Sequence, residues 1–286
     1  MKDIKNKFTR RSFIFTPPLK KSMFNKAINS GVDIVCLELE DGIAPTDKNS
    51  AREKAIQIIN TQKPNDKVEI LIRVNSIRES CGLLDINALL NSKKQPDGLL
   101  VPKIKNPEEL IIIDNLLTEK NLNTKLHAII ETNLGLEKAS FIAASSNRIE
   151  SLFFGAVDMS AELRCQNSWE NLLYARSKVV HAAASKQLDV IDVPFLDLNN
   201  MKKMQEEATK SKYLGFTGKG AIHPKQIKIL NKVFTPSLKE VNKAKKIIQL
   251  FEKSSSGLIV YDGKLIEKPV LREMYRIINI HNIIKK

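Results

Sequence analysis

The 286-residue sequence predicts an α/β fold, namely a (β/α)₈ TIM barrel followed by a C-terminal helical and hairpin extension. Short runs rich in Val, Ile, Leu and Phe alternate with longer segments of helical period along roughly 220 residues. A strand, a helix and another strand at this spacing require parallel pairing, and eight such units match a closed barrel. An open, doubly wound sheet is the alternative fold.

The expected strands are short apolar runs bounded by Gly, Asn or charged residues, which is typical of strands buried on both faces. They cover residues 13–16, 34–39, 69–74, 98–101, 126–130, 152–155, 189–191 and 219–222. Helices are expected at residues 22–29, 47–62, 107–120, 134–145, 171–186, 200–214 and 224–234. The third unit is the weakest, because residues 85–90 are short for a barrel helix.

A C-terminal extension follows the eighth unit. Residues 237–253 have a helical pattern, residues 254–257 break it, and residues 269–284 predict a final helix. Asp262 and Gly263 stand between two apolar runs, which is a strong hairpin signal. We therefore expect a barrel domain over residues 1–236 and an extension over residues 237–286 that caps the barrel or a neighbouring subunit.

Bulk properties indicate one soluble domain in the cytoplasm. With 42% hydrophobic residues the chain can bury a barrel core, and no apolar run approaches the roughly 20 residues that cross a bilayer. Residues 1–7 are charged and no apolar segment follows them, so nothing marks secretion. Cys36, Cys81 and Cys165 are odd in number and widely spaced, which favours reduced thiols.

The net charge of +14 raises the question of a nucleic-acid partner. The lysines are spread over every predicted helix, with no block of five or six like charges and no basic stripe rich in aromatic residues. We therefore expect no nucleic-acid partner and no membrane partner. A basic rim would still attract an anionic ligand such as a phosphorylated cofactor.

Active sites of such barrels lie at the carboxyl ends of the strands, where this sequence places polar residues. These residues are Glu40, Asp41, Arg73, Asn75, Lys103, Glu131, Asp158, Asp192 and His223. Glu131 and Asp158 each end an apolar run, where an ionised acid is tolerated only if it is paired or metal-bound. A carboxylate pair for Mg²⁺ is the leading interpretation. Helix capping and ion pairs with lysines at the barrel mouth are the alternatives.

Eight segments, taken in order, resemble one enzyme family. They read RRSFIFTP at residues 10–17, LELEDGIAP at 37–45, IRVN at 72–75, VPK at 101–103, IET at 130–132, GAVD at 155–158, GK at 218–219 with IHP at 222–224, and DGKLIE at 262–267. The sequence resembles the citrate lyase β-subunit-like group of the HpcH/HpaI aldolase superfamily, which includes malyl-CoA and citramalyl-CoA lyases. The resemblance implies a TIM barrel, a divalent metal (Mg²⁺, with Mn²⁺ as an alternative), an acyl-CoA or acyl-carrier thioester, and a trimeric or hexameric homo-oligomer.

The resemblance also implies roles for the polar residues. Cleavage of a β-hydroxyacyl thioester removes a proton from the hydroxyl group while the C–C bond breaks toward a thioester enolate. Mg²⁺ held by Glu131 and Asp158 would polarise the oxygen that becomes a carbonyl. Arg73 would bind a carboxylate or stabilise the enolate oxygen. Glu40 and Asp41 would hold metal-bound waters or orient Arg73.

Other residues carry several readings. We expect Arg11 and Lys103 to bind substrate or cofactor, although Lys103 also fits a salt bridge or a solvated side chain. Arg73 could form a structural bridge to Glu40 instead of contacting substrate. We assign Trp169, the only tryptophan in the sequence, to packing.

The sequence departs from the family pattern at four positions. Pro18 stands where many relatives have Gly, Val157 where an acid is usual, and Gly220 where Trp often follows the Gly-Lys pair. Glu267 replaces the Asp that the lyases present from the hairpin to the adjacent subunit as acid or base. The extra methylene matters, because a displacement of about 1 Å can cost on the order of 10²-fold in rate.

Three functions follow from these observations. The preferred one is a Mg²⁺-dependent carbon–carbon lyase that acts on a short β-hydroxyacyl-CoA such as malyl-CoA or citramalyl-CoA. The first alternative is a citrate lyase β-subunit that acts on a citryl-carrier-protein thioester. The second is a catalytically degenerate barrel with a binding role, which steep salt-dependent retention on DNA would support.

Overall fold

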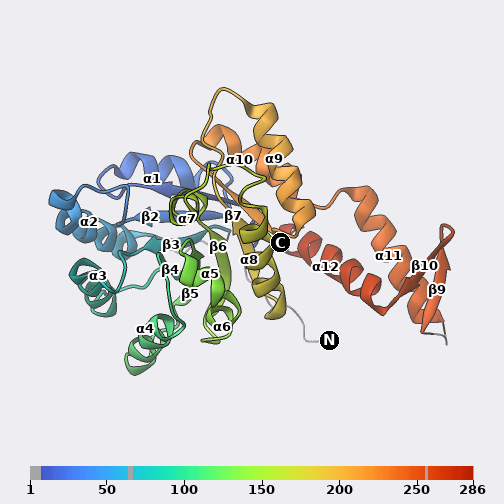
Figure 1. The fold of residues 1–286 in the computed structure, drawn as a ribbon, viewed down its shortest axis with the longest axis horizontal. Helices are drawn as coiled ribbons and strands as arrows, with labels where there is room; N and C mark the ends of the chain where they lie inside the picture. The colour runs from blue at the N-terminus through green and yellow to red at the C-terminus, as the bar shows by residue number, and fades with distance from the viewer. Residues whose placement is uncertain (1–7, 64–66, 255–256, 286) are drawn as a thin grey trace. The chain divides into compact units, whose positions relative to one another are not determined.

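A closed barrel of parallel strands forms the main body of the protein (Figure 1). The structure is a computed structural model that describes residues 8–63, 67–254 and 257–285. Strands β1 to β8 pair in sequence order, and β1 also pairs with β8, with Phe13 beside Gly220. That last pairing closes the barrel. The predicted TIM barrel is confirmed, and the open sheet is excluded.

The barrel strands and the helices that follow them lie close to their predicted positions. The strands are β1 (Ser12–Thr16), β2 (Ile34–Glu38), β3 (Glu69–Arg73), β4 (Gly98–Val101), β5 (Lys125–Ile130), β6 (Ile149–Phe154), β7 (Asp189–Asp192) and β8 (Gly218–Ala221). The helices are α1 (Lys21–Ile28), the 3₁₀ helix η1 (Pro45–Asp47), α2 (Lys48–Thr61), α3 (Ser80–Leu90), α4 (Glu108–Glu119), α5 (Asn133–Glu137), α6 (Ala139–Ala143), α7 (Ala156–Leu163), α8 (Leu173–Ser185), α9 (Met201–Leu214) and α10 (Pro224–Phe234).

The helices differ from the prediction at three places in the chain. Helix α3 is eleven residues long, because it begins at Ser80 rather than near Asp85. Gly82 allows this start, since a Cβ there would collide with the carbonyl oxygen of Ser76. The helix expected at residues 134–145 is divided into α5 and α6 at Lys138. Helix α7 was not predicted at all.

The barrel interior is packed with apolar side chains. The core cluster includes Phe13, Leu71, Leu100, Ile129 and Phe153, each at most 4% exposed. The rings of Phe13 and Phe153 meet edge to face with centroids 5.1 Å apart. This filled core holds the carboxyl ends of the strands in fixed positions, so the side chains that follow them are pre-organised.

The C-terminal segment forms a compact unit of its own. The chain divides between a unit at Arg10–Asn231 and a second unit that contains the segment from Lys232 onward. The second unit holds α11 (Leu238–Lys253), the hairpin β9 (Leu258–Tyr261) and β10 (Lys264–Glu267), and α12 (Lys268–Lys285). The predicted boundary at residues 236 and 237, and the capping role, stay predictions.

Local chemistry explains the ends of these elements. Ser237 caps α11 in a reciprocal capping box with Glu240. Asp262 and Gly263 have φ angles of 52° and 68°, as a two-residue hairpin turn requires. Ser255 and Ser256, in the predicted break, and the charged residues 1–7 lie outside the described residues.

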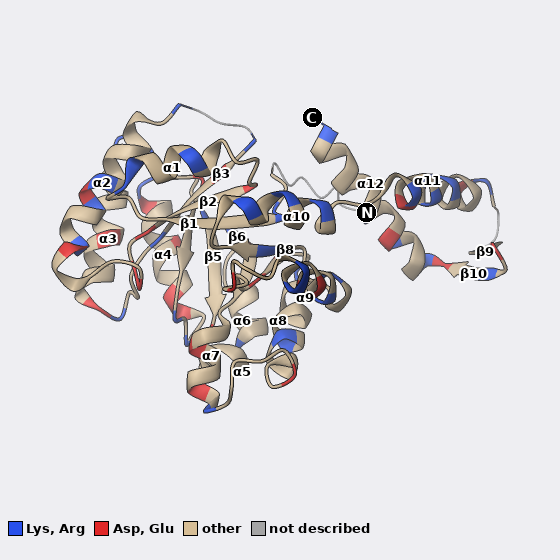
Figure 2. Cartoon of the chain, turned by 90° about the horizontal axis from the view of Figure 1, so that it is seen from above, with Lys and Arg blue, Asp and Glu red and all other residues tan. Residues whose placement is uncertain are grey.

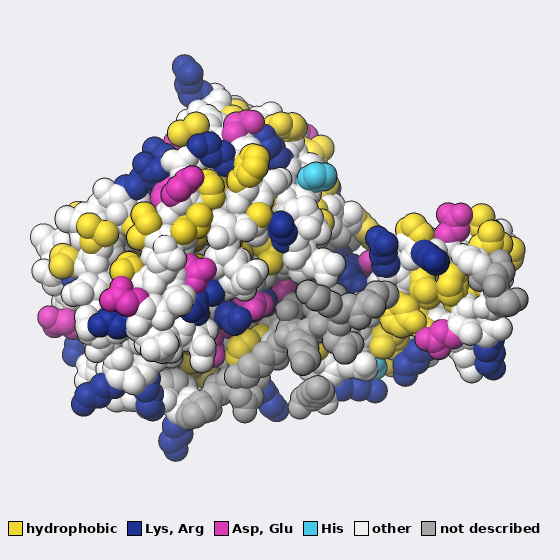
Figure 3. Space-filling model, turned by 90° about the horizontal axis from the view of Figure 1, so that it is seen from below, with side chains coloured by type: hydrophobic (Ala, Val, Ile, Leu, Met, Phe, Trp, Pro, Cys, Tyr) yellow, Lys and Arg dark blue, Asp and Glu magenta, His cyan; other side chains and the backbone are white. Residues whose placement is uncertain are grey.

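Charged side chains are distributed over many elements. Lys and Arg lie on helices around the barrel unit and on α11 (Figure 2). On the face in Figure 3, basic and acidic side chains are interspersed with hydrophobic ones. No helix within the described ranges is long and apolar enough to span a bilayer. The expectation of no nucleic-acid partner stays a prediction.

Candidate active site

Arg73, the last residue of β3, is held between two carboxylates. These are Glu38 at the end of β2 and Glu40 two residues later. Arg73 and Glu38 are paired in register, and Arg73 Nε lies 2.9 Å from Glu38 Oε1 and 2.8 Å from Oε2. Arg73 Nη2 lies 3.0 Å from Glu40 Oε2. The guanidinium carbon lies 4.5 Å from the ring centroid of Phe15. The bridge to Glu40 is thus present, and the guanidinium is fixed in position.

Glu38 is a site residue that the sequence reasoning missed. Residues 37–40 alternate Leu and Glu, and alternate residues of an extended chain face the same side. This alternation could have indicated that Glu38 faces the same side as Glu40. Glu38 and Glu40 are 5% and 4% exposed. Burial raises the pKa of both carboxyls, although the charge of Arg73 opposes the shift. Two buried acids therefore share one cation.

Lys103 contacts three of the predicted acids through its backbone and its side chain. Its Nζ lies 2.5 Å from Glu40 Oε1 and 2.9 Å from Asp41 Oδ1. Its backbone N–H donates to Glu131 Oε1 at 2.7 Å. The φ angle of Lys103 is 53°, a left-handed conformation that is unfavourable for a residue with a Cβ. Of the readings given to Lys103, the salt bridge is present in this structure.

Glu131 and Asp158 lie at neighbouring strand ends. Glu131 follows β5 and is 3% exposed, while Asp158 is half-buried in the first turn of α7, directly after β6. Gly155 makes room for Glu131, because a Cβ there would collide with Glu131 Oε2. Thr132, not Glu131, caps α5 through a hydrogen bond from Gly135 N–H. The capping alternative for Glu131 is therefore wrong.

Electrostatics at this pair favour a bound cation. Burial first, and then the charge of Asp158, raise the pKa of Glu131 to about 8. Both acids line a pocket of about 420 Å³, whose walls also include the basic residues Arg78, Lys103 and Lys105 and the acidic residues Glu79 and Glu162. The three basic side chains could contact a ligand that carries carboxylate groups.

The residues present fit a divalent metal held by two carboxylates. A buried carboxylate beside a second one is unfavourable unless a cation neutralises both. Carboxylate oxygens are ligands that Mg²⁺ prefers, and this ion usually keeps several waters. In the part of the chain that the structure describes, no group of three or more His, Cys, Asp or Glu side chains is placed to share one metal ion. Water or substrate oxygens would complete the coordination.

Comparison with known proteins identifies the family. Residues 11–224 match the family described as HpcH/HpaI aldolase/citrate lyase. The chain belongs to this family. It is 32% identical over 275 residues to citrate lyase subunit beta of Haemophilus influenzae, with 92% of this chain and 93% of that protein covered. Its relatives are named lyases, and the chain is an enzyme of the same class.

Other members of the family are similar over most of their length. Human mitochondrial citramalyl-CoA lyase is 28% identical over 298 residues, with coverage of 97% of this chain and 87% of that protein. L-malyl-CoA/beta-methylmalyl-CoA lyase of Cereibacter sphaeroides is 29% identical over 286 residues, with 90% of each chain covered. Among solved structures, the citrate lyase beta subunit of M. tuberculosis complexed with oxaloacetate and magnesium is 25% identical, with a TM-score of 0.69 and coverage of 80% of this chain and 99% of that one.

A hydrogen-bond network behind the candidate site fixes the loop that carries Glu40. Lys48 Nζ donates to the carbonyl oxygens of Leu39 and Glu40 at 2.8 and 2.7 Å, and to Asn75 Oδ1 at 2.7 Å. Asn75 Nδ2 donates in turn to Leu39 O and to Asp85 Oδ2. This network ties the loops after β2 and β3 together. Lys48 carried no sequence signal, because its partners are backbone carbonyls.

Arg11 lies at the other end of the lyase barrel. It directly precedes β1, and its Nε and Nη2 donate to the carboxylate of Asp33 at 2.8 and 2.7 Å. Asp33 directly precedes β2, so both residues stand at the amino ends of their strands. Arg73 and Glu131 stand at the carboxyl ends. The structure therefore does not bring Arg11 together with the other predicted site residues, because its position before β1 places it at the wrong end.

Glu267 lies in the second compact unit. It is the last residue of β10, pairs in register with Leu258, and has an exposed side chain. Its role stays a prediction. The remaining predicted residues, Glu40, Asp41, Arg73, Lys103, Glu131 and Asp158, are brought together around one barrel mouth by the contacts described above.

Proposed function

We propose that this lyase is a Mg²⁺-dependent carbon–carbon lyase that cleaves or condenses a short β-hydroxyacyl-CoA thioester such as malyl-CoA or citramalyl-CoA. The observation that carries the proposal is the link that Lys103 makes between the metal pair and Arg73: its backbone N–H donates to Glu131, and its Nζ contacts Glu40, which also pairs with Arg73. Citramalyl-CoA lyase and malyl-CoA lyase among its relatives support the substrate class. The magnesium in the M. tuberculosis structure supports the metal, with Mn²⁺ as the alternative.

Arg73 would stabilise the charge that develops during cleavage. Its Nε and Nη2 are engaged by Glu38 and Glu40, and no described residue accepts a hydrogen bond from Nη1. Nη1 is thus available for the thioester oxygen as the C–C bond electrons move into the enolate. Because the guanidinium is already fixed, this stabilisation needs no rearrangement during the reaction.

Glu131 and Asp158 would hold the metal, and when bound this ion would supply positive charge that polarises the hydroxyl oxygen of the substrate. The backbone N–H of Lys103 orients the Glu131 carboxylate for this task. Lys103 Nζ lies against Glu40 and Asp41, and its charge favours the ionised forms of both carboxyls. The cleaved bond leaves its electron pair on the thioester fragment, which finally takes up a proton at carbon.

We assign both proton transfers to Glu267 of a neighbouring copy: its carboxylate takes the proton that leaves the hydroxyl group and then returns it to the enolate carbon. Glu267 ends a hairpin that belongs to a unit distinct from the barrel, and its exposed carboxyl is suited to contact another subunit. The proposal includes a homo-oligomer, trimeric or hexameric, located in the cytoplasm.

Binding and turnover together test this function. Calorimetry should detect Mg²⁺ binding to the wild-type protein and none to Glu131→Ala or Asp158→Ala, because two protein ligands are few for this ion. A panel of hydroxyacyl-CoA thioesters should then reveal metal-dependent cleavage. Unchanged Mg²⁺ affinity in both variants would reject the metal site.

A citrate lyase β-subunit is the second candidate, favoured by 32% identity to the Haemophilus influenzae protein. In that case the substrate thioester is attached to a carrier protein rather than to CoA. Cleavage of a citryl group on a purified acyl carrier, with no turnover of any CoA thioester, would select this function over the preferred one.

A further inference from the structure

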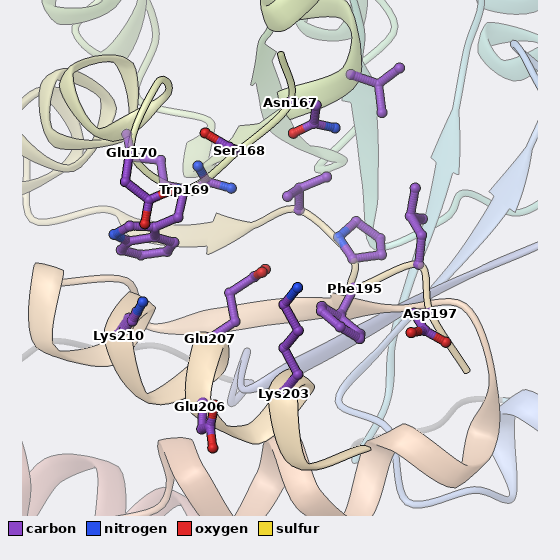
Figure 4. A pocket seen from close by; sticks show the side chains of 15 residues that line it. Asn167, Ser168, Trp169, Glu170, Phe195, Asp197, Lys203, Glu206, Glu207 and Lys210 are labelled. Carbon is purple, nitrogen blue, oxygen red and sulfur yellow. The ribbon is translucent and has the colours of Figure 1, made fainter. Parts of the chain in front are cut away.

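A second pocket, of about 510 Å³, opens beside the candidate site (Figure 4). Its walls come from residues 167–170 before α8, residues 193–197 after β7, and helix α9. Val157 also lines it and is 54% exposed. Val157 directly precedes Asp158 in the first turn of α7, so a single helical turn borders both pockets. The second pocket therefore lies at the same end of the barrel as the metal pair.

A buried ionic network fixes the floor of this pocket. Lys219 is completely buried, and its Nζ lies 2.6 Å from Asp192 Oδ2 and 2.8 Å from Glu207 Oε1. Arg176 Nε donates to Asp192 Oδ1 at 3.1 Å. The guanidinium carbon of Arg176 lies 4.7 Å from the ring centroid of Trp169. Both Glu207 and Trp169 are thus held in place without a ligand, and Trp169 forms a pocket wall in addition to packing.

The walls of the pocket combine apolar and charged side chains. Val157, Val193, Pro194 and Phe195 are apolar, whereas Glu170, Asp197, Lys203 and Lys210 carry charge. Lys203 and Glu207 point from α9 into the space between Trp169 and Phe195, whereas Glu206 points away from it (Figure 4). Glu207 is neutralised by Lys219.

Lys203 and Lys210 line the pocket and are not used by this network. Lys219 and Arg176 are both paired with buried acids, but no carboxylate of the described chain lies within ion-pair distance of Lys203 Nζ. The side chain of Lys203 is exposed at this pocket, and a cation directed into a pocket attracts an anionic group. A water molecule takes up about 30 Å³, so the pocket has room for a chain of several carbons.

We propose that this pocket binds the substituent of the hydroxyacyl substrate, and that it selects an aliphatic chain ending in a carboxylate. The inference rests on the proposed lyase function. The apolar stem would lie against Val157 and Pro194, next to the metal pair, and the terminal carboxylate would reach Lys203. The preferred substrate would then be a thioester larger than malyl-CoA.

Paired substrates and paired variants test this inference. We compare thioesters whose substituents have equal length and end either in a carboxylate or in a methyl group. Lys203→Met should lower kcat/KM about tenfold for the carboxylate series only, as expected for one charge-assisted hydrogen bond. Lys202→Met is the control, because Lys202 is exposed on the same helix and does not line the pocket. An equal effect on both series, or none, would overturn the inference.

Calorimetry with free acids separates this inference from the lyase function. A six-carbon dicarboxylic acid should bind the wild-type protein and should bind Lys203→Met about tenfold more weakly. Hexanoic acid should show no such difference between the two proteins. This measurement needs no turnover, so it still decides the question if no thioester is cleaved. Failure of the dicarboxylic acid to bind, or equal binding to both proteins, would overturn the inference.

Discussion

Arg73 and Glu38 face each other at the carboxyl ends of two adjacent strands, with Arg73 Nε 2.8 Å from Glu38 Oε2. The strand register itself creates this pair. Because both side chains are largely buried, the carboxylate supports the arginine in one orientation rather than merely neutralising it. Glu38 therefore belongs to the site although it is not required to touch a ligand.

Glu38→Gln should impair catalysis more than folding. The amide keeps the shape of the side chain but provides a weaker acceptor, so Arg73 loses part of its support and kcat/KM should fall about tenfold. Thermal melts beside steady-state kinetics check this, with Glu119→Gln on the exposed surface of α4 as control. A large loss of stability with unchanged kcat/KM would assign Glu38 a purely structural role.

The left-handed backbone conformation of Lys103 predicts that its Gly variant is more stable than its Ala variant. Lys103→Gly and Lys103→Ala both lose the contacts to Glu40 and Asp41, but only Gly adopts the φ of 53° without strain. The Ala variant should be less stable than the Gly variant by about 0.5–1 kcal/mol. Urea unfolding of the two proteins measures the difference. Greater stability of the Ala variant would contradict the left-handed conformation.

The shifted carboxyl of Glu131 predicts a pH dependence for the metal-free protein. Burial and Asp158 raise the pKa of Glu131 from 4.5 to about 8, so between these values the folded state retains a proton that the unfolded state has lost. The free energy of unfolding should therefore fall as the pH rises through this window. Glu131→Gln should flatten the fall, as measured by urea unfolding in the presence of a chelator. An equal slope in both proteins would count against the shifted pKa.

Mixed oligomers test the role of Glu267. Glu131→Ala and Glu267→Ala should each be inactive, whereas mixing them should restore part of the activity, since some sites then combine an intact metal pair with an intact carboxyl. Glu267→Asp is the companion variant, and it should raise turnover if the longer side chain fits poorly. No recovery after demonstrated subunit exchange would place Glu267 outside a neighbour's site.

The fold was largely predictable because buried parallel strands leave continuous apolar runs. The run before Glu131 and the run before Asp158 marked both strands and the acids at their ends. Helix α3 was predicted too short, because Gly82 near its start lowers helical propensity while close packing against Ser76 requires it. Helix α7 is only eight residues long and follows β6 after Gly155 alone, so no loop signal separated the two elements.

The sequence predicted the site residues that directly follow a strand, such as Glu131, because the end of an apolar run marks the carboxyl end of a barrel strand. Lys48 could not be inferred, because a lysine that donates to two carbonyls resembles any surface lysine in a sequence. Arg11 was misplaced for a different reason, since the sequence motif extends past the amino end of β1 and gives no indication of which end a residue occupies. Glu38 was accessible from the alternation of residues 37–40.

Carbon–carbon cleavage by the wild-type and Arg73→Lys proteins is the most direct test of the proposed activity. Malyl-CoA and citramalyl-CoA are incubated with each protein, with and without Mg²⁺, and the products are quantified by mass spectrometry. We predict equal amounts of acetyl-CoA and the matching 2-oxo acid, formed only with Mg²⁺, and a loss of about 10²-fold in Arg73→Lys because lysine lacks the planar fork. Intact thioesters, or free CoA released without C–C cleavage, would contradict the proposed lyase.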